Sequence, residues 1–326
     1  MAVGKLVVLT SGMEPDMWDL FMSEKPAGWV VTKVNPDEGE QKIIKEVADA
    51  EYLFTMGIGR VSPKVIENAK NLKLIQAMTQ GTEHLPIKEA MERNIPVCNT
   101  GGANAMAVAE FTLLLMLAAT RKLLPLNQSL KEGRFRGNLG RKETHELYDQ
   151  TIGILGFGNI GRRVAKICHD GFGANIIYYE RMFIPYALGA DSHARPVSMD
   201  ELFAQSDIVT IHIPSMASTK GVIGWNELSK MKPTAYLINT SRGAVLDEKA
   251  LIRALQEKKI AGAGIDVWDP EPPKPDNPLL HMPNVVATPH SAGPAWEIWQ
   301  PSFEVMWTNA VLVSEGKQPL GQVREF

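Results

Sequence analysis

Three residues in the second half of the chain each follow an apolar run that is typical of a buried β-strand. Arg242 follows the run at 235–239, Glu271 the run at 263–267, and His290 the run at 285–288. An arginine grips a carboxylate with two parallel hydrogen bonds and helps to polarise a neighbouring carbonyl group. A protonated histidine donates a proton as negative charge develops on a carbonyl oxygen, and a carboxylate beside it stabilises the protonated ring. Together these residue types are suited to the reduction of a carbonyl group by hydride transfer.

Each of these residues also has an ordinary structural interpretation when it is taken alone. His290 could be a satisfied histidine after a strand, Glu271 could be a solvated residue of the proline-rich loop at 270–278, and Arg242 could cap a helix or form an ion pair. Ligands of doubly wound sheets, however, bind outside the carboxyl ends of the strands, and all three residues fall at that edge. Their joint position therefore favours a catalytic site.

A glycine-rich turn with the spacing G-x-G-x-x-G lies at 156–161, between an apolar run at 152–155 and a helix-like segment at 162–168. In such a turn the first glycine makes the bend, the second lets the backbone approach a pyrophosphate, and the third lets helix and strand pack closely. The helix N-terminus offers free N–H groups to the anion. A second apolar run ends in Glu180, 19 residues beyond Gly161, where an acid accepts hydrogen bonds from the adenosine ribose. A purely structural turn would not need these flanking signals, so the pattern predicts a dinucleotide site.

Strand-like and helix-like segments alternate along the chain at the spacing of βαβ units. In the first half, strands are predicted at 5–9, 29–34, 52–56, 72–77 and 95–98, and helices at 41–50 and 63–69. In the second half, further strands are predicted at 176–179 and 208–213 and helices at 199–204 and 248–257, the latter with Asp247 as N-cap. A helix that is apolar almost all round is predicted at 105–124, and a last helix at 297–313.

These elements predict an α/β protein with two Rossmann-like, doubly wound parallel-sheet domains. We place the first boundary in the glycine turn at 99–104. The segment after His290 is too short for a domain of its own, so we expect it to pack on the first domain, which is then discontinuous. The substrate-binding domain would comprise 1–103 and 292–326, and the dinucleotide-binding domain 104–291. Substrate would bind in the cleft between them.

The composition is that of a globular protein outside the membrane. The chain has 326 residues, 44% of them hydrophobic and 22% charged, with a formal net charge of −3 and no long basic run. Nucleic acids and membrane surfaces are therefore poor candidates for partners. Cys98 and Cys168 lie beside apolar residues and are expected to be buried free thiols of a reducing compartment. The longest apolar stretch, at 111–119, is too short to span a bilayer. A cytoplasmic location is expected.

Four motifs, at 153–165, 237–247, 264–272 and 284–290, resemble in order and spacing those of the D-isomer-specific 2-hydroxyacid dehydrogenases. The resemblance covers nearly the whole chain. It implies two α/β domains, NAD as the cofactor and the interconversion of a 2-oxoacid and a D-2-hydroxyacid. It also implies a homodimer, formed in part by the helix that begins near 108–110. The longer members of the family carry a regulatory domain, which this chain is expected to lack.

The resemblance assigns roles to individual residues. His290 is similar to the family's acid–base residue, Glu271 to its carboxylate partner and Arg242 to its substrate-binding arginine. Thr79, Gln80 and Gly81 lie where a first-domain loop offers N–H groups to the substrate carboxylate. No metal site is implied. The residues expected to contact the cofactor are Gly156, Phe157, Gly158, Asn159, Ile160, Gly161, Glu180, Arg181, His212, Ile213, Pro214, Thr219, Thr240, Ser241, Asp266, His290 and Gly293.

The chain departs from the family's usual pattern at the two ends of the expected site. Gln80 stands where many relatives have a small residue, so the substrate end of the pocket is expected to differ. Glu180 stands where aspartate is commoner, and Arg181 follows it. A glutamate repels the 2′-phosphate of NADP and an arginine attracts it, and we expect NAD to be preferred.

Three alternative functions share the predicted architecture. The first is a formate-dehydrogenase-like enzyme. The resembling enzymes of this kind have glutamine at the position of Glu271, so the glutamate of this chain argues against that function. Phosphite-oxidising relatives keep all three polar residues, so phosphite oxidation stays open as an alternative function. An NAD-sensing corepressor would be expected to carry extra tails for partner proteins, which this chain almost lacks.

Overall fold

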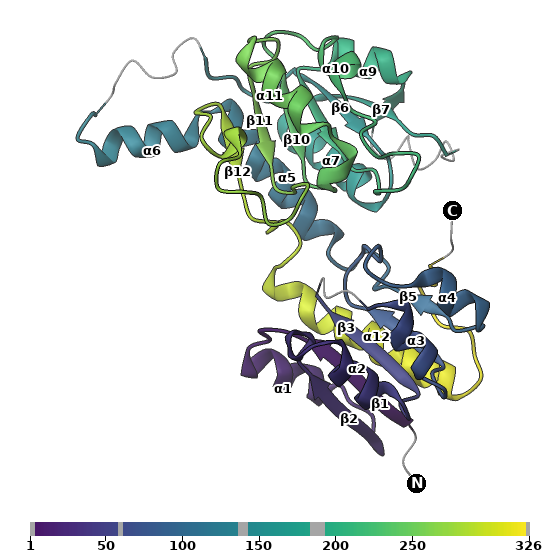
Figure 1. Ribbon diagram of the computed structural model, residues 1–326. Helices are drawn as coiled ribbons and strands as arrows, with labels where there is room; N and C mark the ends of the chain where they lie inside the picture. Colours follow the sequence, from purple (N-terminus) through teal and green to yellow (C-terminus); the bar gives the residue numbers. More distant parts are fainter. Residues whose placement is uncertain (1–3, 58–60, 136–142, 183–192, 324–326) are drawn as a thin grey trace. The chain divides into compact units, whose positions relative to one another are not determined.

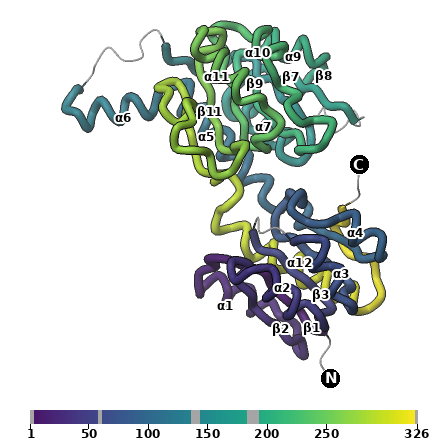
Figure 2. The backbone as a smooth tube through the Cα atoms, in the orientation of Figure 1, coloured from purple at the N-terminus to yellow at the C-terminus, as the bar shows by residue number. Residues whose placement is uncertain are grey.

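The structure, a computed structural model, describes residues 4–57, 61–135, 143–182 and 193–323 (Figure 1). The chain divides into two compact units. Unit 1 is drawn from Met1–Asn104 and Ala295–Phe326, and unit 2 is Ala105–Pro294. Figure 2 traces the backbone of each unit. Both units are α/β folds on parallel sheets, and the C-terminal segment joins unit 1. The predicted fold class, with a discontinuous first domain, is confirmed.

The sheet of unit 1 has the strand order β2-β1-β3-β4-β5, with neighbouring strands parallel. The order reverses between β1 and β3, as in doubly wound folds. The strands are β1 (Gly4–Thr10), β2 (Trp29–Val34), β3 (Tyr52–Met56), β4 (Leu74–Ala77) and β5 (Val97–Cys98). The helices are α1 (Pro15–Ser23), α2 (Glu40–Val47), α3 (Pro63–Asn68), α4 (Ile87–Glu92) and α12 (Trp299–Ser314), with 3₁₀ turns η1 (Pro36–Glu38) and η4 (Trp296–Ile298).

Helices cover both faces of this sheet, because its strands point apolar side chains to both sides. One core cluster joins the sheet to α2, α3 and α4, and the other joins it to α1 and α12. Trp307 of α12 stacks on Phe21 of α1 and donates its indole N–H to the Phe21 carbonyl oxygen at 3.0 Å. The C-terminal helix is therefore part of the core of unit 1.

The sheet of unit 2 has the parallel strand order β12-β11-β10-β9-β6-β7-β8. The strands are β6 (Thr151–Leu155), β7 (Asn175–Tyr179), β8 (Ala194–Pro196), β9 (Ile208–Ile211), β10 (Tyr236–Asn239), β11 (Gly262–Ile265) and β12 (Val285–Ala287). The helices are α5 (Ala105–Thr120), α6 (Leu123–Lys131), α7 (Asn159–Phe172), α9 (Met199–Gln205), α10 (Trp225–Leu228) and α11 (Glu248–Gln256), with 3₁₀ turns η2 (Gly243–Val245) and η3 (Pro278–Leu280). The order reverses between β6 and β9, which is the switch point where ligands of such sheets bind.

Alternate residues of the strands in unit 2 point to opposite faces. Ile208 packs in the cluster that contains α5 and α7, and its neighbour Val209 packs in the cluster that contains α9, α10 and α11. The two core layers hold the carboxyl ends of β6, β9, β10, β11 and β12 along one edge. Asp247 caps α11, as expected, since its carboxylate accepts hydrogen bonds from the N–H groups of Lys249 and Ala250.

The prediction of one apolar helix at 105–124 is wrong at the C-terminal end of that helix. The helix α5 stops at Thr120, and Lys122 adopts a left-handed conformation with φ of 53° before α6 starts at Leu123. The cause is Pro125. It has no N–H to give to the turn before it, and it is tolerated only in the first turn of a helix. The apolar pattern runs through this break because α6 is itself rich in leucine.

Several short elements were not predicted, among them α1, α4, α10 and β8. The strand β8 has the sequence Ala-Arg-Pro, which has no apolar run to mark it. Both cysteines are buried and free, as expected. In the described part of the chain, no helix is long and apolar enough to cross a membrane.

Candidate active site

The glycine turn joins β6 to α7 and is shaped by two close approaches. Gly156 has φ of 96°, and a Cβ there would lie 2.7 Å from the carbonyl of His212. A Cβ on Gly161 would lie 2.2 Å from the carbonyl oxygen of Gly156. By contrast, a Cβ on Gly158 would meet no atom within 4 Å. The first and third glycines are therefore required by the fold itself, whereas the second leaves open space beside the backbone.

The start of α7 has the features of an anion site. Gly158 is its N-cap and supplies no side-chain cap, so the first N–H groups of the helix have no acceptor from the cap residue. Glu180, directly after β7, lies against the same turn, because its Oε2 accepts a hydrogen bond from the N–H of Phe157 at 2.9 Å. The glycine turn and Glu180, which the sequence pattern assigned to one dinucleotide site, are thus in contact.

Arg242 lies in a turn that the buried side chain of Asn239 organises. The Asn239 Oδ1 accepts hydrogen bonds from the N–H and hydroxyl of Ser241, and its amide donates to the carbonyl oxygen of Arg242 at 3.1 Å. Thr240 is tied to α5 by a hydroxyl–hydroxyl contact with Thr112 at 2.8 Å. These bonds hold the backbone on both sides of Arg242 at the carboxyl end of β10.

The turn of Arg242 is pressed against the loop of Glu271. A Cβ on Gly243 would lie 2.1 Å from the carbonyl carbon and oxygen of Trp268. The N–H of Trp268 in turn donates to Oε1 of Glu271 at 2.9 Å, and its indole N–H donates to the carbonyl oxygen of Thr288 at 3.0 Å. Trp268 therefore connects the arginine turn, the glutamate and the end of β12.

His290 and Glu271 form a pair in which Nδ1 of the imidazole lies 2.8 Å from Oε2 of the carboxylate. A carboxylate accepts, so Nδ1 carries the proton and Nε2 is directed away from the pair. In the described part of the chain, no residue forms a hydrogen bond with Nε2. The two side chains keep 33% and 30% of their surface exposed, which leaves them accessible to a ligand.

The backbone at His290 is held by Asp266, which is completely buried after β11. Its carboxylate accepts hydrogen bonds from the hydroxyl of Thr288 at 2.6 Å and from the N–H groups of Ser291 and Ala292 at 2.9 Å. The N–H of His290 donates to the carbonyl oxygen of Asp266 at 2.7 Å, and His290 has φ of 54°. Asp266 thus fixes a strained turn that presents the imidazole.

The charges around Glu271 favour its ionised form. Partial burial acts to raise the pKa of this carboxyl group, but the hydrogen bonds from His290 and from the N–H of Trp268 and the positive charges of His290 and Arg242 outweigh it. The net effect is that the pKa of Glu271 is lowered. The carboxylate is therefore available to stabilise a protonated imidazole.

The residues at 212–219 follow the carboxyl end of β9, beside the glycine turn. Burial lowers the pKa of His212 to about 3, so its ring is neutral, and its Nε2 lies 2.9 Å from the hydroxyl of Thr210. The hydroxyl of Thr219 donates to the carbonyl oxygen of Pro214 and accepts from the N–H of Met216, which closes the loop. Arg181 reaches the hydroxyl of Ser218 at 3.5 Å.

The loop predicted to bind substrate follows β4 in unit 1. The side chain of Asn99 donates to the carbonyl oxygen of Gln80 at 3.0 Å, and the hydroxyl of Thr79 donates to that of Gly81 at 2.7 Å. In the described part of the chain, no residue accepts a hydrogen bond from the N–H groups of Thr79, Gln80 or Gly81.

Comparisons with known proteins give the family. The family model described as "D-isomer specific 2-hydroxyacid dehydrogenase, NAD binding domain" matches residues 113–292. The glyoxylate reductase of Korarchaeum cryptofilum is 35% identical over 292 residues, which cover 87% of this chain and 85% of the relative. The chain belongs to the D-isomer specific 2-hydroxyacid dehydrogenase family. It is an NAD-dependent oxidoreductase of 2-hydroxy and 2-oxo acids.

Two further relatives define the extent of the likeness between this dehydrogenase and known proteins. The D-3-phosphoglycerate dehydrogenase of Archaeoglobus fulgidus is 37% identical over 262 residues, or 80% of this chain, but the chain covers only 49% of that relative. The crystal structure of a glyoxylate reductase from Paecilomyes thermophila has a TM-score of 0.87 at 30% identity, with 99% of both chains covered. The match thus extends over both units.

The structure of this dehydrogenase brings together most of the residues that the sequence singled out, at the carboxyl edge of the sheet in unit 2. Sequence reasoning gave no role to Gly243, Trp268 or Asn239, which position Arg242 and Glu271. A signal for Trp268 did exist, because a buried indole needs a partner for its N–H. The contact of Gly243 with Trp268 has no local sequence signal.

Proposed function

We propose that this dehydrogenase reduces a small 2-oxoacid to the D-2-hydroxyacid with NADH, and that Arg242, Glu271 and His290 carry the reaction. The observation that supports this most directly is the contact between Nδ1 of His290 and the carboxylate of Glu271, at the sheet edge that also carries the glycine turn. The names of the glyoxylate reductase relatives favour a substrate with a short side chain.

In this proposal His290 is the acid–base residue. Its Nε2 donates a proton to the carbonyl oxygen as negative charge develops there, and takes the proton back in the reverse reaction. Glu271 holds Nδ1 and stabilises the charged ring. Arg242 binds the substrate carboxylate and helps to polarise the carbonyl group. The N–H groups of Thr79, Gln80 and Gly81 in unit 1 would bind an anionic group.

The open space at Gly158 and the uncapped start of α7 fit a dinucleotide, since a pyrophosphate needs both close backbone approach and N–H donors. When bound there, NADH supplies the hydride. Glu180 would accept hydrogen bonds from the ribose and repel the 2′-phosphate of NADP. Because Arg181 already donates to Ser218, we propose that NAD is preferred.

The test is NADH oxidation, with NADPH in parallel, against glyoxylate, pyruvate, hydroxypyruvate, 3-phosphohydroxypyruvate, phenylpyruvate and 2-ketogluconate, followed by chiral analysis of the product. Turnover should be fastest with the small members of the panel, which are glyoxylate, pyruvate and hydroxypyruvate. The product should be the D-isomer wherever it is chiral. Silence across the panel with NADH binding intact would overturn the proposal in favour of phosphite oxidation or an NAD-sensing role.

The assigned roles are tested with His290→Ala and Arg242→Ala. Each should lose about 10²-fold or more in kcat/KM while NADH fluorescence titrations stay unchanged. His281→Ala is the matched control, because His281 is an exposed histidine of the same unit whose ring lies at hydrogen-bond distance from the carbonyl oxygen of Pro275. Loss of NADH binding in both active-site variants would contradict the roles.

We also propose that the protein is a homodimer in which α6 packs on a second copy. Leu123, Leu124, Leu126 and Leu130 of this helix are 40–60% exposed, and leucines gathered on one short helix favour a protein partner. Light scattering should give a molar mass twice that of the chain. The double variant Leu126→Glu with Leu130→Glu should reduce this molar mass to that of a single chain. A monomeric unaltered protein would refute this.

A further inference from the structure

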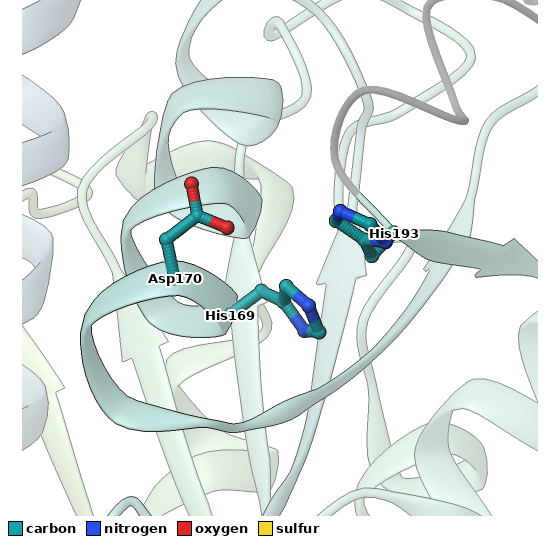
Figure 3. Close-up of side chains that lie close together, drawn as sticks. All are labelled: His169, Asp170 and His193. Carbon is teal, nitrogen blue, oxygen red and sulfur yellow. The ribbon is translucent and has the colours of Figure 1, made fainter.

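Two imidazoles and a carboxylate meet at the edge of unit 2 that lies opposite the candidate active site (Figure 3). His169 and Asp170 lie in the last turn of α7, before the amino end of β7, and His193 lies directly before the amino end of β8. Arg242, Glu271 and His290, by contrast, follow carboxyl ends of strands. This cluster therefore belongs to neither the cofactor site nor the catalytic site.

The imidazole of His169 is held in the tautomer that a metal ligand needs. Its Nδ1 lies 3.1 Å from the carbonyl oxygen of Ala174. A carbonyl oxygen can only accept, so Nδ1 carries the proton and Nε2 of the neutral ring presents a lone pair. Histidines that bind metals commonly donate their second ring N–H to a backbone carbonyl, which fixes the ring orientation.

The other two side chains face the same space. The rings of His169 and His193 are stacked, with centroids 4.3 Å apart and planes inclined by 24°. Asp170 projects from the same turn of α7 toward His193 (Figure 3). One ligand atom of each residue lies within 4.8 Å of the other two. In a tetrahedral zinc site the ligand atoms are about 3.4 Å apart, a spacing that modest rotations of the exposed Asp170 and His193 would reach.

We propose that His169, Asp170 and His193 bind one divalent transition-metal ion of the zinc type, with water completing the coordination. Imidazole nitrogen and carboxylate oxygen are the ligands that zinc, cobalt, nickel and copper accept in proteins. An adjoining hollow of about 350 Å³, lined by both histidines, leaves room for the ion and its water. The bound ion would tie the end of α7 to the start of β8 and stabilise the native state by mass action.

The position of Lys166 gives this proposal a distinctive test. Its ammonium group hydrogen-bonds Oδ2 of Asp170 at 2.5 Å, so it competes with the ion for the charge of this carboxylate. Removing the lysine charge should therefore strengthen metal binding, while removal of a ligand should weaken it. Because the pair is exposed, the gain is expected to be up to about fivefold.

The experiment is a titration of the tag-free, EDTA-treated full chain with ZnCl₂ by calorimetry, and with CoCl₂ by visible absorption. The unaltered protein should bind one equivalent and show the d–d bands of cobalt with nitrogen and oxygen ligands. His169→Gln, Asp170→Asn and His193→Gln should each weaken binding at least about tenfold. Lys166→Gln should tighten it.

Two control variants separate this site from other histidines. His281→Gln removes an exposed histidine elsewhere in unit 2, and His290→Gln removes the imidazole that is paired with Glu271. Both should keep the one-equivalent binding and the cobalt spectrum. Equal binding by the protein that lacks both His169 and His193 would overturn the proposal, as would a protein that binds inorganic phosphate and no metal at this cluster.

Discussion

Gly243 and Trp268 pack backbone against backbone, so closely that a Cβ on the glycine would lie 2.1 Å from the carbonyl carbon and oxygen of the tryptophan. Gly243 follows the arginine of the candidate active site, and the N–H of Trp268 binds its glutamate. This single contact sets the spacing between the group proposed to bind substrate and the group proposed to support the acid–base residue.

Gly243→Ala should therefore impair both stability and turnover. The new methyl group forces the two backbones apart, and overpacking of this kind costs about 1–3 kcal/mol of the free energy of unfolding. Urea unfolding and kcat/KM are the measurements. Gly171→Ala in α7 is the control, since its Cβ would meet no atom within 4 Å and it should gain up to about 1 kcal/mol. Equal behaviour of the two variants would contradict the role of the contact.

The three glycines of the turn at 156–161 should respond differently to alanine. Gly161→Ala places its Cβ 2.2 Å from the carbonyl oxygen of Gly156, so it should lower the free energy of unfolding. Gly158→Ala meets no protein atom, so it should leave stability unchanged but raise the Kd for NADH at least about tenfold by blocking backbone approach. Thermal unfolding and fluorescence titration measure the two effects. Unchanged NADH affinity in Gly158→Ala would argue against the cofactor site.

Glu271→Gln should change the pH dependence of stability in a defined direction. The pKa of Glu271 is lowered in the folded protein, so its ionised form stabilises the fold above the carboxyl group's ordinary pKa, and this contribution is lost as the pH falls through the lowered value. The difference in unfolding free energy between the unaltered protein and Glu271→Gln should accordingly shrink from pH 7 toward pH 3. A constant difference would show that the charge does not act.

The same substitution should also move the pH profile of 2-oxoacid reduction. In the proposed mechanism reduction needs a protonated His290, and the imidazolium loses its counter-charge in Glu271→Gln. The pH at which the rate of reduction falls to half should therefore move to lower values, with NADH binding retained. Stopped-flow reduction across pH 5 to 9 tests this, and an unmoved midpoint would refute the pairing.

Asp266→Asn should loosen the turn that carries His290. The buried carboxylate accepts hydrogen bonds from Thr288, Ser291 and Ala292. The amide of asparagine has only one oxygen, so its NH₂ group would face at least one of these N–H or O–H groups. A buried unsatisfied group costs about 1–3 kcal/mol. Thr288→Val removes one of the three bonds and should cost less. Chemical unfolding ranks the two variants, and the reverse order would contradict the assigned role of Asp266.

Both thiols should be unreactive in the native protein. Burial raises the pKa of Cys98 and of Cys168 to about 12, so neither forms a thiolate near neutral pH. Ellman's reagent at pH 8 should label neither cysteine in buffer and both in 6 M guanidinium chloride. Fast labelling of the folded protein would show that one of them is accessible.

The pattern of residues along the chain was sufficient for the fold class and for the principal groups of the candidate site. Apolar runs at the βαβ spacing predict parallel sheets whatever their exact ends, and the glycine spacing before Glu180 predicts the turn that the structure has at the start of α7. Because parallel strands end at a common edge, Arg242, Glu271 and His290 could be assigned to one edge before their contacts were known.

Contacts between residues far apart in the sequence were decided only by tertiary packing. No local pattern pairs Gly243 with Trp268, surrounds the Asp266 carboxylate with three donors or stacks His169 on His193. The end of α5, by contrast, has a local signal in Pro125, which hydrophobic periodicity does not carry because the apolar pattern continues into α6. Periodicity encodes which face of an element is buried, whereas the depth and partner of each side chain follow from how the buried faces fit together.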